Sequence, residues 1–141
     1  MERAIWQYIR YTVTSILMEP GKHLILDLYG CEADLLNDYE KLKYIFEDTL
    51  CICNATVLNM VGNKFEPQGV TLLALLAESH ASIHTWPEHN YCAIDFYTCG
   101  DFSRPQGIAD HLFIKLGAKS RLERTLDRAP KLCIFKEEYT S

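Results

Sequence analysis

The densest group of side chains that could do chemistry lies in the segment ESHASIHTWPEH, residues 78–89. These twelve residues hold three histidines, two serines, a threonine and two glutamates, and apolar runs lie on both sides. A strand with alternating apolar and polar positions does not require so many ionisable and hydroxyl groups. The segment is therefore the first candidate for a functional site.

A metal centre is one chemistry that these side chains could support. On a strand, His80 and His84 point to the same face, but Pro87 breaks that geometry before Glu88 and His89. No HExxH helix motif is present. Because spacing alone is weak evidence for ligands, we expect no metal site.

A hydrolytic serine is a second possible chemistry. The nucleophile of many serine hydrolases lies on a G-x-S-x-G turn, where glycines allow the sharp bend. In this sequence Glu78 and His80 flank Ser79 instead of glycines. The local pattern therefore does not favour a hydrolytic triad built on this serine.

The segment also carries a resemblance to a known family. ESHASIHTWPE followed by YCAIDFYTCG closely resembles the prokaryotic S-adenosylmethionine decarboxylases. The resemblance continues upstream through FEPQGVTLLALLAESH and loosely to GKHLILDLYG, so that it covers roughly residues 21–120. Residues 1–19 and about the last twenty lie outside it.

This resemblance implies a cofactor made from the chain itself. A decarboxylase must stabilise the carbanion left when CO₂ departs, and most enzymes import an electron sink for that purpose. In this family a serine attacks the carbonyl before it, and the ester then eliminates to dehydroalanine, which hydrolyses to a pyruvoyl group. The resemblance implies that Ser79 is the pyruvoyl precursor, which forms a Schiff base with substrate. The chain would cut itself after Glu78 into residues 1–78 and 79–141.

The helper residues are implied by position. His84 matches the histidine that takes the serine Cα proton, a task that suits a neutral imidazole. Thr71 stands where many relatives have a serine whose hydroxyl supports the oxyoxazolidine step. Cys99 matches the thiol that protonates the substrate α-carbon. Without the resemblance, Cys99 is more simply interpreted as a small apolar filler at a strand end.

Two residues match the family's substrate pocket. Phe65 matches the aromatic that stacks on adenine, and a sulfonium also suits an aromatic face. Glu88 matches the carboxylate that binds the ribose hydroxyls. The alternatives are that Phe65 belongs to the core and that Glu88 is a turn residue. We expect Trp86 to pack in the core, and His80 either to shape the site or to make a structural hydrogen bond.

The resemblance therefore predicts decarboxylation of S-adenosylmethionine for spermidine synthesis, and three alternatives stay open. The first is a pyruvoyl-dependent decarboxylase of arginine or ornithine, because one fold can host several substrates. The second is a non-catalytic regulatory paralogue that does not process itself. The third is a zinc-binding module, which would carry stoichiometric metal.

Composition limits the class of protein. The chain has 141 residues, 48% of them apolar, and a net charge of −5, which fits one domain and argues against a nucleic-acid partner. Residues 1–19 lack a long apolar run, so we expect neither a signal peptide nor a membrane segment. The six cysteines are then best interpreted as reduced thiols of a cytoplasmic protein.

The periodicity predicts the elements that must position these residues. Predicted helices cover residues 4–18, 34–50 and 105–117, and predicted strands cover 22–30, 55–61, 70–77, 81–86, 91–98, 119–126 and 131–136, with a loop at 63–69. This order predicts an α+β two-layer sandwich with a mainly antiparallel sheet and helices on one face. We expect one domain over 1–141, with 1–20 as an N-terminal extension. The resemblance implies a homodimer or higher assembly with the active site near the interface.

Overall fold

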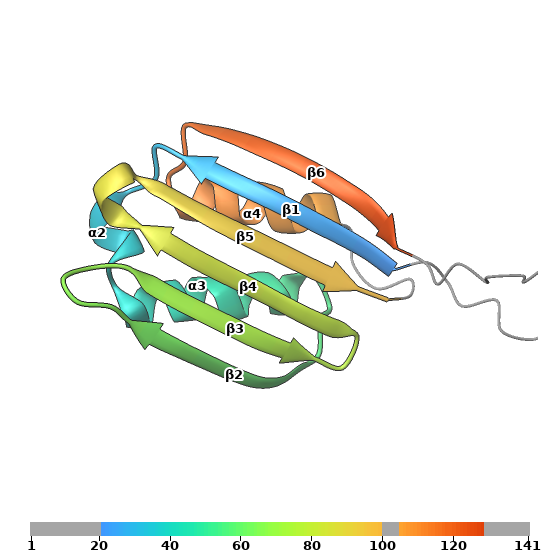
Figure 1. Ribbon diagram of the computed structural model, residues 1–141. Helices are drawn as coiled ribbons and strands as arrows, with labels where there is room; N and C mark the ends of the chain where they lie inside the picture. Colours follow the sequence, from blue (N-terminus) through green and yellow to red (C-terminus); the bar gives the residue numbers. More distant parts are fainter. Residues whose placement is uncertain (1–20, 100–104, 129–141) are drawn as a thin grey trace, which may run out of the picture.

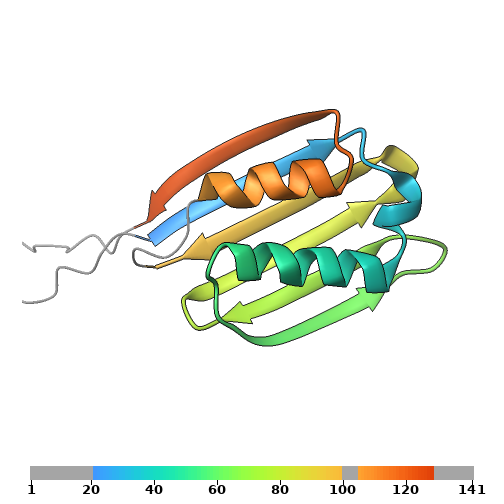
Figure 2. The ribbon, with the colours of Figure 1, turned by 180° about the vertical axis from the view of Figure 1, so that it is seen from behind.

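The computed structural model describes residues 21–99 and 105–128, which form one antiparallel sheet with helices on one face (Figures 1 and 2). The elements are β1 (Gly21–Tyr29), α2 (Ala33–Leu36), α3 (Tyr39–Ile52), β2 (Val57–Lys64), β3 (Val70–Leu76), β4 (Ser79–Trp86), the 3-10 helix η1 (Pro87–His89), β5 (Tyr91–Thr98), α4 (Pro105–Lys115) and β6 (Ser120–Arg128). The predicted helix at 4–18 and strand at 131–136 lie outside the described residues.

The six strands lie in the order β2-β3-β4-β5-β1-β6, and every neighbouring pair is antiparallel. Strands β2 to β5 follow one another as a meander, and β1 lies between β5 and β6. Helices α3 and α4 cover the same face of the sheet (Figure 2). The predicted α+β two-layer sandwich is therefore confirmed.

The core lies between the sheet and these helices. Alternate residues of the central strands are buried there, as the period of two in a strand requires. Its largest fully buried side chains are Phe46, Phe96, Leu24, Leu26, Leu28, Leu36, Leu42, Leu50, Leu72, Ile83, Ile108 and Leu112. A buried threonine connects the sheet to the helical layer. The Thr85 hydroxyl accepts a hydrogen bond from the Val70 backbone N–H at 2.8 Å and donates one to the Leu36 carbonyl oxygen at 2.8 Å.

Several predicted boundaries differ from the structure; β4, for example, begins at Ser79 and not at the expected residue 81. Two of the differences have a clear local cause. The helix expected at 34–50 is divided, because Asp38 is extended and its Oδ1 accepts a hydrogen bond from the Lys41 N–H at 3.1 Å. An aspartate that caps in this way starts a new helix. Strand β2 runs to Lys64, beyond the expected end at 61, because Lys64 still pairs with Val70 of β3.

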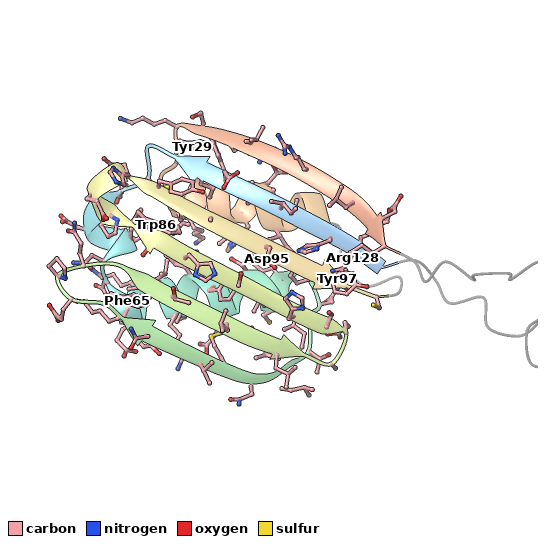
Figure 3. The ribbon with its side chains drawn as sticks, in the orientation of Figure 1. Tyr29, Phe65, Trp86, Asp95, Tyr97 and Arg128 are labelled. Atoms are coloured by element: carbon pink, nitrogen blue, oxygen red, sulfur yellow. The ribbon has the colours of Figure 1, made fainter. Side chains whose placement is uncertain are left out.

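The second face of the sheet, which we name the open face, has no helix over it in the described structure (Figure 3). Exposed apolar side chains on it include Ile25, Val61, Leu73, Leu75, Leu122 and Leu126. Trp86 also lies there, 39% exposed and stacked on Tyr91 at 5.3 Å between ring centroids, so its predicted core position was wrong. An uncovered apolar face of this kind is typical of an interaction surface.

No helix in residues 21–99 and 105–128 has the length and apolar character needed to cross a membrane.

Candidate active site

The predicted cleavage bond lies where the chain enters β4. Ser79 is the first residue of that strand and pairs with Thr98 at the end of β5. The backbone carbonyl oxygen of Glu78 accepts a hydrogen bond from the Cys99 N–H at 3.3 Å. The sheet therefore holds the scissile carbonyl of Glu78 beside Cys99, twenty-one residues further along the chain.

The Glu78 side chain fixes this turn from the other side. Its two carboxylate oxygens accept from the Thr56 N–H at 3.3 and 3.1 Å. Slight burial acts to raise the pKa of Glu78, but these hydrogen bonds outweigh it and the net pKa lies below its usual value. The carboxylate therefore anchors the β3–β4 turn to the residue before β2.

Cys99 is exposed, and its thiol lies 3.5 Å from the Tyr97 hydroxyl. The hydrogen bond with Cys99, followed by desolvation, raises the pKa of Tyr97 above its usual value. The Arg128 guanidinium lies over the Tyr97 ring, 4.5 Å from its centroid. The alternative interpretation of Cys99 as a buried filler was therefore wrong, and its thiol is accessible beside the cleavage bond.

A network of hydrogen bonds and one ion-pair contact extends from Ser79 across the open face. His80 Nδ1 lies 3.3 Å from Ser79 Oγ, and His80 Nε2 lies 3.3 Å from Asp95 Oδ1. The same carboxylate oxygen is 3.3 Å from His23 Nε2, and the Ser82 hydroxyl donates to Asp95 Oδ2. We name this set the His80–Asp95 network.

Sequence reasoning missed two members of this network, His23 and Asp95. Asp95 is the only carboxylate of an otherwise apolar strand, which is a signal that could have identified it, whereas His23 shares its strand with Lys22 and Asp27 and does not stand out. Their proximity depends on the β1–β5 register, in which Ile25 is paired with Asp95 and His23 with Tyr97. Periodicity does not report that register.

His84 and Thr71 form a second group. They are paired residues on β4 and β3, and His84 Nδ1 lies 3.0 Å from Thr71 Oγ1. Both are partly buried on the open face. The structure therefore brings together the two residues to which the resemblance assigns support of processing.

The predicted substrate residues lie at the same end of the sheet as this pair. Phe65 follows β2 directly and is 48% exposed, so the alternative core position was wrong (Figure 3). Its N–H donates to the Gly69 carbonyl oxygen at 2.8 Å. Gly69 has φ +102°, a region that favours glycine, and a Cβ there would lie 3.0 Å from the Thr85 carbonyl oxygen. Glu88 lies in η1, directly after β4, and is exposed.

The predicted site residues therefore form two groups at opposite ends of β4. The first group, at the cleavage end, is Glu78, Ser79 and Cys99; the second, at the far end, is Thr71, His84, Phe65 and Glu88. Ser79 and His84 are five positions apart, which in a strand corresponds to about 16 Å. A single chain does not bring the two groups into contact.

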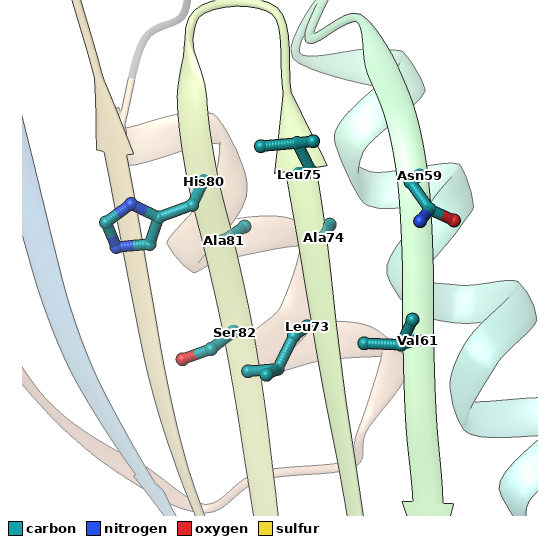
Figure 4. Close-up of a pocket in the computed structure, with 8 residues that line it drawn as sticks. All are labelled: Asn59, Val61, Leu73, Ala74, Leu75, His80, Ala81 and Ser82. Atoms are coloured by element: carbon teal, nitrogen blue, oxygen red, sulfur yellow. The ribbon is translucent and has the colours of Figure 1, made fainter.

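A shallow groove of about 310 Å³ lies on the open face, across β2, β3 and β4 (Figure 4). Val61, Leu73 and Leu75 supply most of its lining, and His80 and Ser82 border it from β4. The groove is therefore chiefly apolar, with polar side chains at both edges, Asn59 on β2 and His80 and Ser82 on β4.

Comparison with known proteins identifies the family of this chain. The family model described as S-adenosylmethionine decarboxylase matches residues 22–129. The chain is 48% identical over 108 residues to an S-adenosylmethionine decarboxylase proenzyme of Prochlorococcus marinus (strain MIT 9313), covering 77% of this chain and 86% of the relative. It is 44% identical over 120 residues to the proenzyme of Synechococcus sp. (strain WH7803), covering 85% and 94%.

A solved structure is also similar. The crystal structure of the adenosylmethionine decarboxylase from Aquifex aeolicus VF5 matches with a TM-score of 0.74 and 35% identity, covering 88% of this chain and 99% of that one. Sequence profile, close relatives and fold all agree. The chain belongs to the S-adenosylmethionine decarboxylase family.

Proposed function

We propose that this protein is a self-processing, pyruvoyl-dependent decarboxylase that converts S-adenosylmethionine to its decarboxylated form and CO₂. The observation that carries the proposal is the Glu78–Ser79 bond, whose carbonyl oxygen faces the Cys99 N–H at 3.3 Å. Family membership and the proenzyme names of the relatives support it. A pyruvoyl group would supply the electron sink for decarboxylation, and the proposal assigns its formation to Ser79.

Processing begins with the chain's own atoms. Ser79 Oγ attacks the Glu78 carbonyl carbon, the C–N bond breaks, and an ester to Ser79 replaces the amide while the Ser79 nitrogen becomes a free amine. Negative charge develops on the Glu78 carbonyl oxygen during this step. The Cys99 N–H already points at that oxygen, and such preorganised donors stabilise developing charge.

Elimination completes the cofactor. His84 removes the Ser79 Cα proton, the ester carboxylate of Glu78 leaves, and dehydroalanine remains. Water then replaces the amine nitrogen as ammonia departs, which leaves the pyruvoyl group at the start of the C-terminal fragment. The Thr71 hydroxyl, 3.0 Å from His84 Nδ1, helps to orient the imidazole.

The two ends of the sheet supply one site if two copies of the chain pair through their open faces. A two-fold axis parallel to the sheet and across its strands reverses the strand direction in the partner. The cleavage end of one copy then lies over the far end of the other. Val61, Leu73, Leu75 and Trp86 supply apolar surface for this contact. We therefore propose a homodimer in which Ser79 of one chain reacts beside His84 of the other.

The far end favours an adenosyl substrate. Phe65 exposes an aromatic face, and base–aromatic stacking contributes about 1–3 kcal/mol. Glu88 offers an exposed carboxylate that can accept from two ribose hydroxyls. Arginine and ornithine would use neither contact, so these residues favour S-adenosylmethionine over a basic amino acid.

Intact-mass spectrometry of the purified protein beside Ser79→Ala tests the proposal. We expect two fragments that divide after Glu78, with a pyruvoyl-blocked second fragment, and an uncut control. A single uncut chain that is stable for days would contradict self-processing and favour a non-catalytic regulatory paralogue.

A further inference from the structure

We propose that His80 is the general base that activates Ser79 for self-cleavage, and that Asp95 is the residue that positions it. The inference rests on the proposed function and concerns its first step, ester formation. It is carried by the His80–Asp95 network, which links the Ser79 hydroxyl to a carboxylate through one imidazole.

The proton positions in the network follow from the outermost contact. Arg128 Nη1 lies 3.3 Å from His23 Nδ1, and a guanidinium only donates hydrogen bonds. His23 Nδ1 must therefore accept, so the proton of the neutral His23 ring is on Nε2. That N–H points at Asp95 Oδ1, 3.3 Å away.

The same reasoning determines the tautomer of His80. An ionised carboxylate only accepts hydrogen bonds, and Asp95 accepts from His23 and from the Ser82 hydroxyl, while His80 Nε2 lies in ion-pair contact 3.3 Å from Oδ1, where a lone pair on Nε2 would be repelled. His80 therefore carries its proton on Nε2 when neutral. Its Nδ1 is left with a free lone pair, 3.3 Å from Ser79 Oγ, which is the arrangement that a general base requires.

The surroundings of His80 leave it able to exchange protons. Its side chain is 49% exposed. The groups that face the ring are Asp95 and Tyr97 from β5, His23 from β1 and apolar Leu75 from β3, and Arg128 of β6 reaches the network through His23. Asp95 is therefore the carboxylate that contacts His80 and stabilises its protonated form during the step.

The step balances within one chain. The Ser79 hydroxyl proton moves to His80 Nδ1, Oγ bonds to the Glu78 carbonyl carbon, and the carbonyl electron pair moves to the oxygen beside the Cys99 N–H. Collapse breaks the C–N bond, and His80 returns the proton to the Ser79 nitrogen. His84 takes no part in this step, and a variant that lacks it can therefore isolate ester formation.

A metal centre is the competing interpretation of this network. His23, His80 and Asp95 each place one ligand-type atom within 4.8 Å of the others. A metal at His23 Nε2 would move the ring proton to Nδ1, where it would face the Arg128 guanidinium, donor against donor. The hydrogen-bonded network avoids that conflict, and it is therefore the interpretation that we favour.

Hydroxylamine cleavage isolates the proposed step. In a His84→Ala background elimination is blocked, and hydroxylamine cleaves the ester but not the amide. At a hydroxylamine concentration that no longer limits the rate, cleavage measures ester formation. We expect His80→Gln in this background to slow cleavage about 100-fold or more, the usual contribution of a general base.

The pH profile separates a base from a structural residue. With His80 present, the rate should rise as the imidazole loses its proton and then become constant. With His80→Gln it should rise continuously with pH, because hydroxide must replace the base. Equal cleavage rates with and without His80→Gln, or the same plateau in both pH profiles, would overturn the base role of His80. Wild-type protein that stays uncut would instead overturn the proposed function.

Two further variants test positioning against metal binding. Asp95→Asn should slow ester formation, and the double variant Asp95→Asn/His80→Gln should be little slower than Asp95→Asn alone. His23→Gln should change the rate only a few-fold. A His23→Gln loss as large as that of His80→Gln, together with inhibition by a chelator and recovery with Zn²⁺, would overturn the base role in favour of a metal site. Thermal unfolding of each variant confirms that it is folded.

Discussion

The two ends of the open face differ in what they hold in place. At the cleavage end, the scissile carbonyl, the Glu78 carboxylate and Ser79 Oγ all lie within 3.3 Å of a potential partner from the same chain. At the far end, His84 has such a partner in Thr71, whereas Phe65 and Glu88 are exposed. The cleavage end is therefore built to position a bond, and the far end to receive something from outside the chain.

This difference also shows that nearness in sequence is not nearness in space. Ser79 and His84 are five residues apart, which would be about 7.5 Å along a helix. On a strand the same interval is about 16 Å. In the proposed dimer, the two ends of one β4 strand would therefore belong to two different active sites.

The largest expected effect is that of His84→Ala, which should block elimination while leaving ester formation intact. His84→Ala should stop processing completely at the ester, because the far end supplies the elimination base. The ester has the same mass as the precursor, so intact mass alone shows no change, and hydroxylamine should then cut the chain after Glu78. Ser79→Ala/His84→Ala is the control and should resist hydroxylamine. Division of the His84→Ala chain into two fragments without hydroxylamine would show that another residue removes the Ser79 Cα proton.

Breaking the contact between ends should have nearly as large an effect. Leu73→Glu places a charge midway along β3 on the open face, where Leu73 is 45% exposed, so the dimer should dissociate and processing should stop. Analytical ultracentrifugation and intact mass measure the two effects. Tyr44→Glu on α3, where the side chain is 70% exposed, is the matched control and should change neither.

A substitution at Cys99 distinguishes the role of its backbone N–H in processing from the role of its thiol in decarboxylation. Cys99→Ala keeps the backbone N–H that faces the Glu78 carbonyl oxygen, so processing should continue. Turnover should fall about 10²–10⁴-fold, because the acid that protonates the product carbon is lost. Release of CO₂ and formation of decarboxylated product are measured together. Cys51→Ala, at another exposed cysteine, should retain full activity.

The smallest effect concerns the substrate. Phe65→Ala should raise KM for S-adenosylmethionine about 10- to 100-fold, since a stacking contact contributes about 1–3 kcal/mol. The kcat value and self-cleavage should change little, because Phe65 touches neither reacting bond in this account. Unchanged KM would show that the adenine lies elsewhere, and activity on arginine or ornithine that exceeds adenosyl turnover would favour the basic amino-acid alternative.

Much of the fold could be predicted because the strands alternate so regularly. The strands at 70–76 and 91–98 agree with prediction because one face of each is buried. The long helix was divided by Asp38, whose capping hydrogen bond is a local competition that periodicity does not reveal. Trp86 was misplaced because an aromatic on an uncovered face has the same pattern as one in a core.

The site was only partly predictable. The resemblance identified Ser79, His84 and Cys99, and their assigned roles stay predictions. It did not indicate that β4 places Ser79 and His84 at opposite ends. His23 and Asp95 could not be found at all, because they meet only through the register of two strands that are distant in sequence.

The most direct test of the central claim is complementation between two inactive chains. Ser79→Ala and His84→Ala are co-expressed with different tags, and the mixed dimer is purified through both tags and weighed by intact-mass spectrometry. The account predicts that each variant alone stays at full mass, whereas in the mixed dimer the His84→Ala chain is cut after Glu78. An uncut mixed dimer, or cleavage of His84→Ala on its own, would contradict a site shared between the two ends.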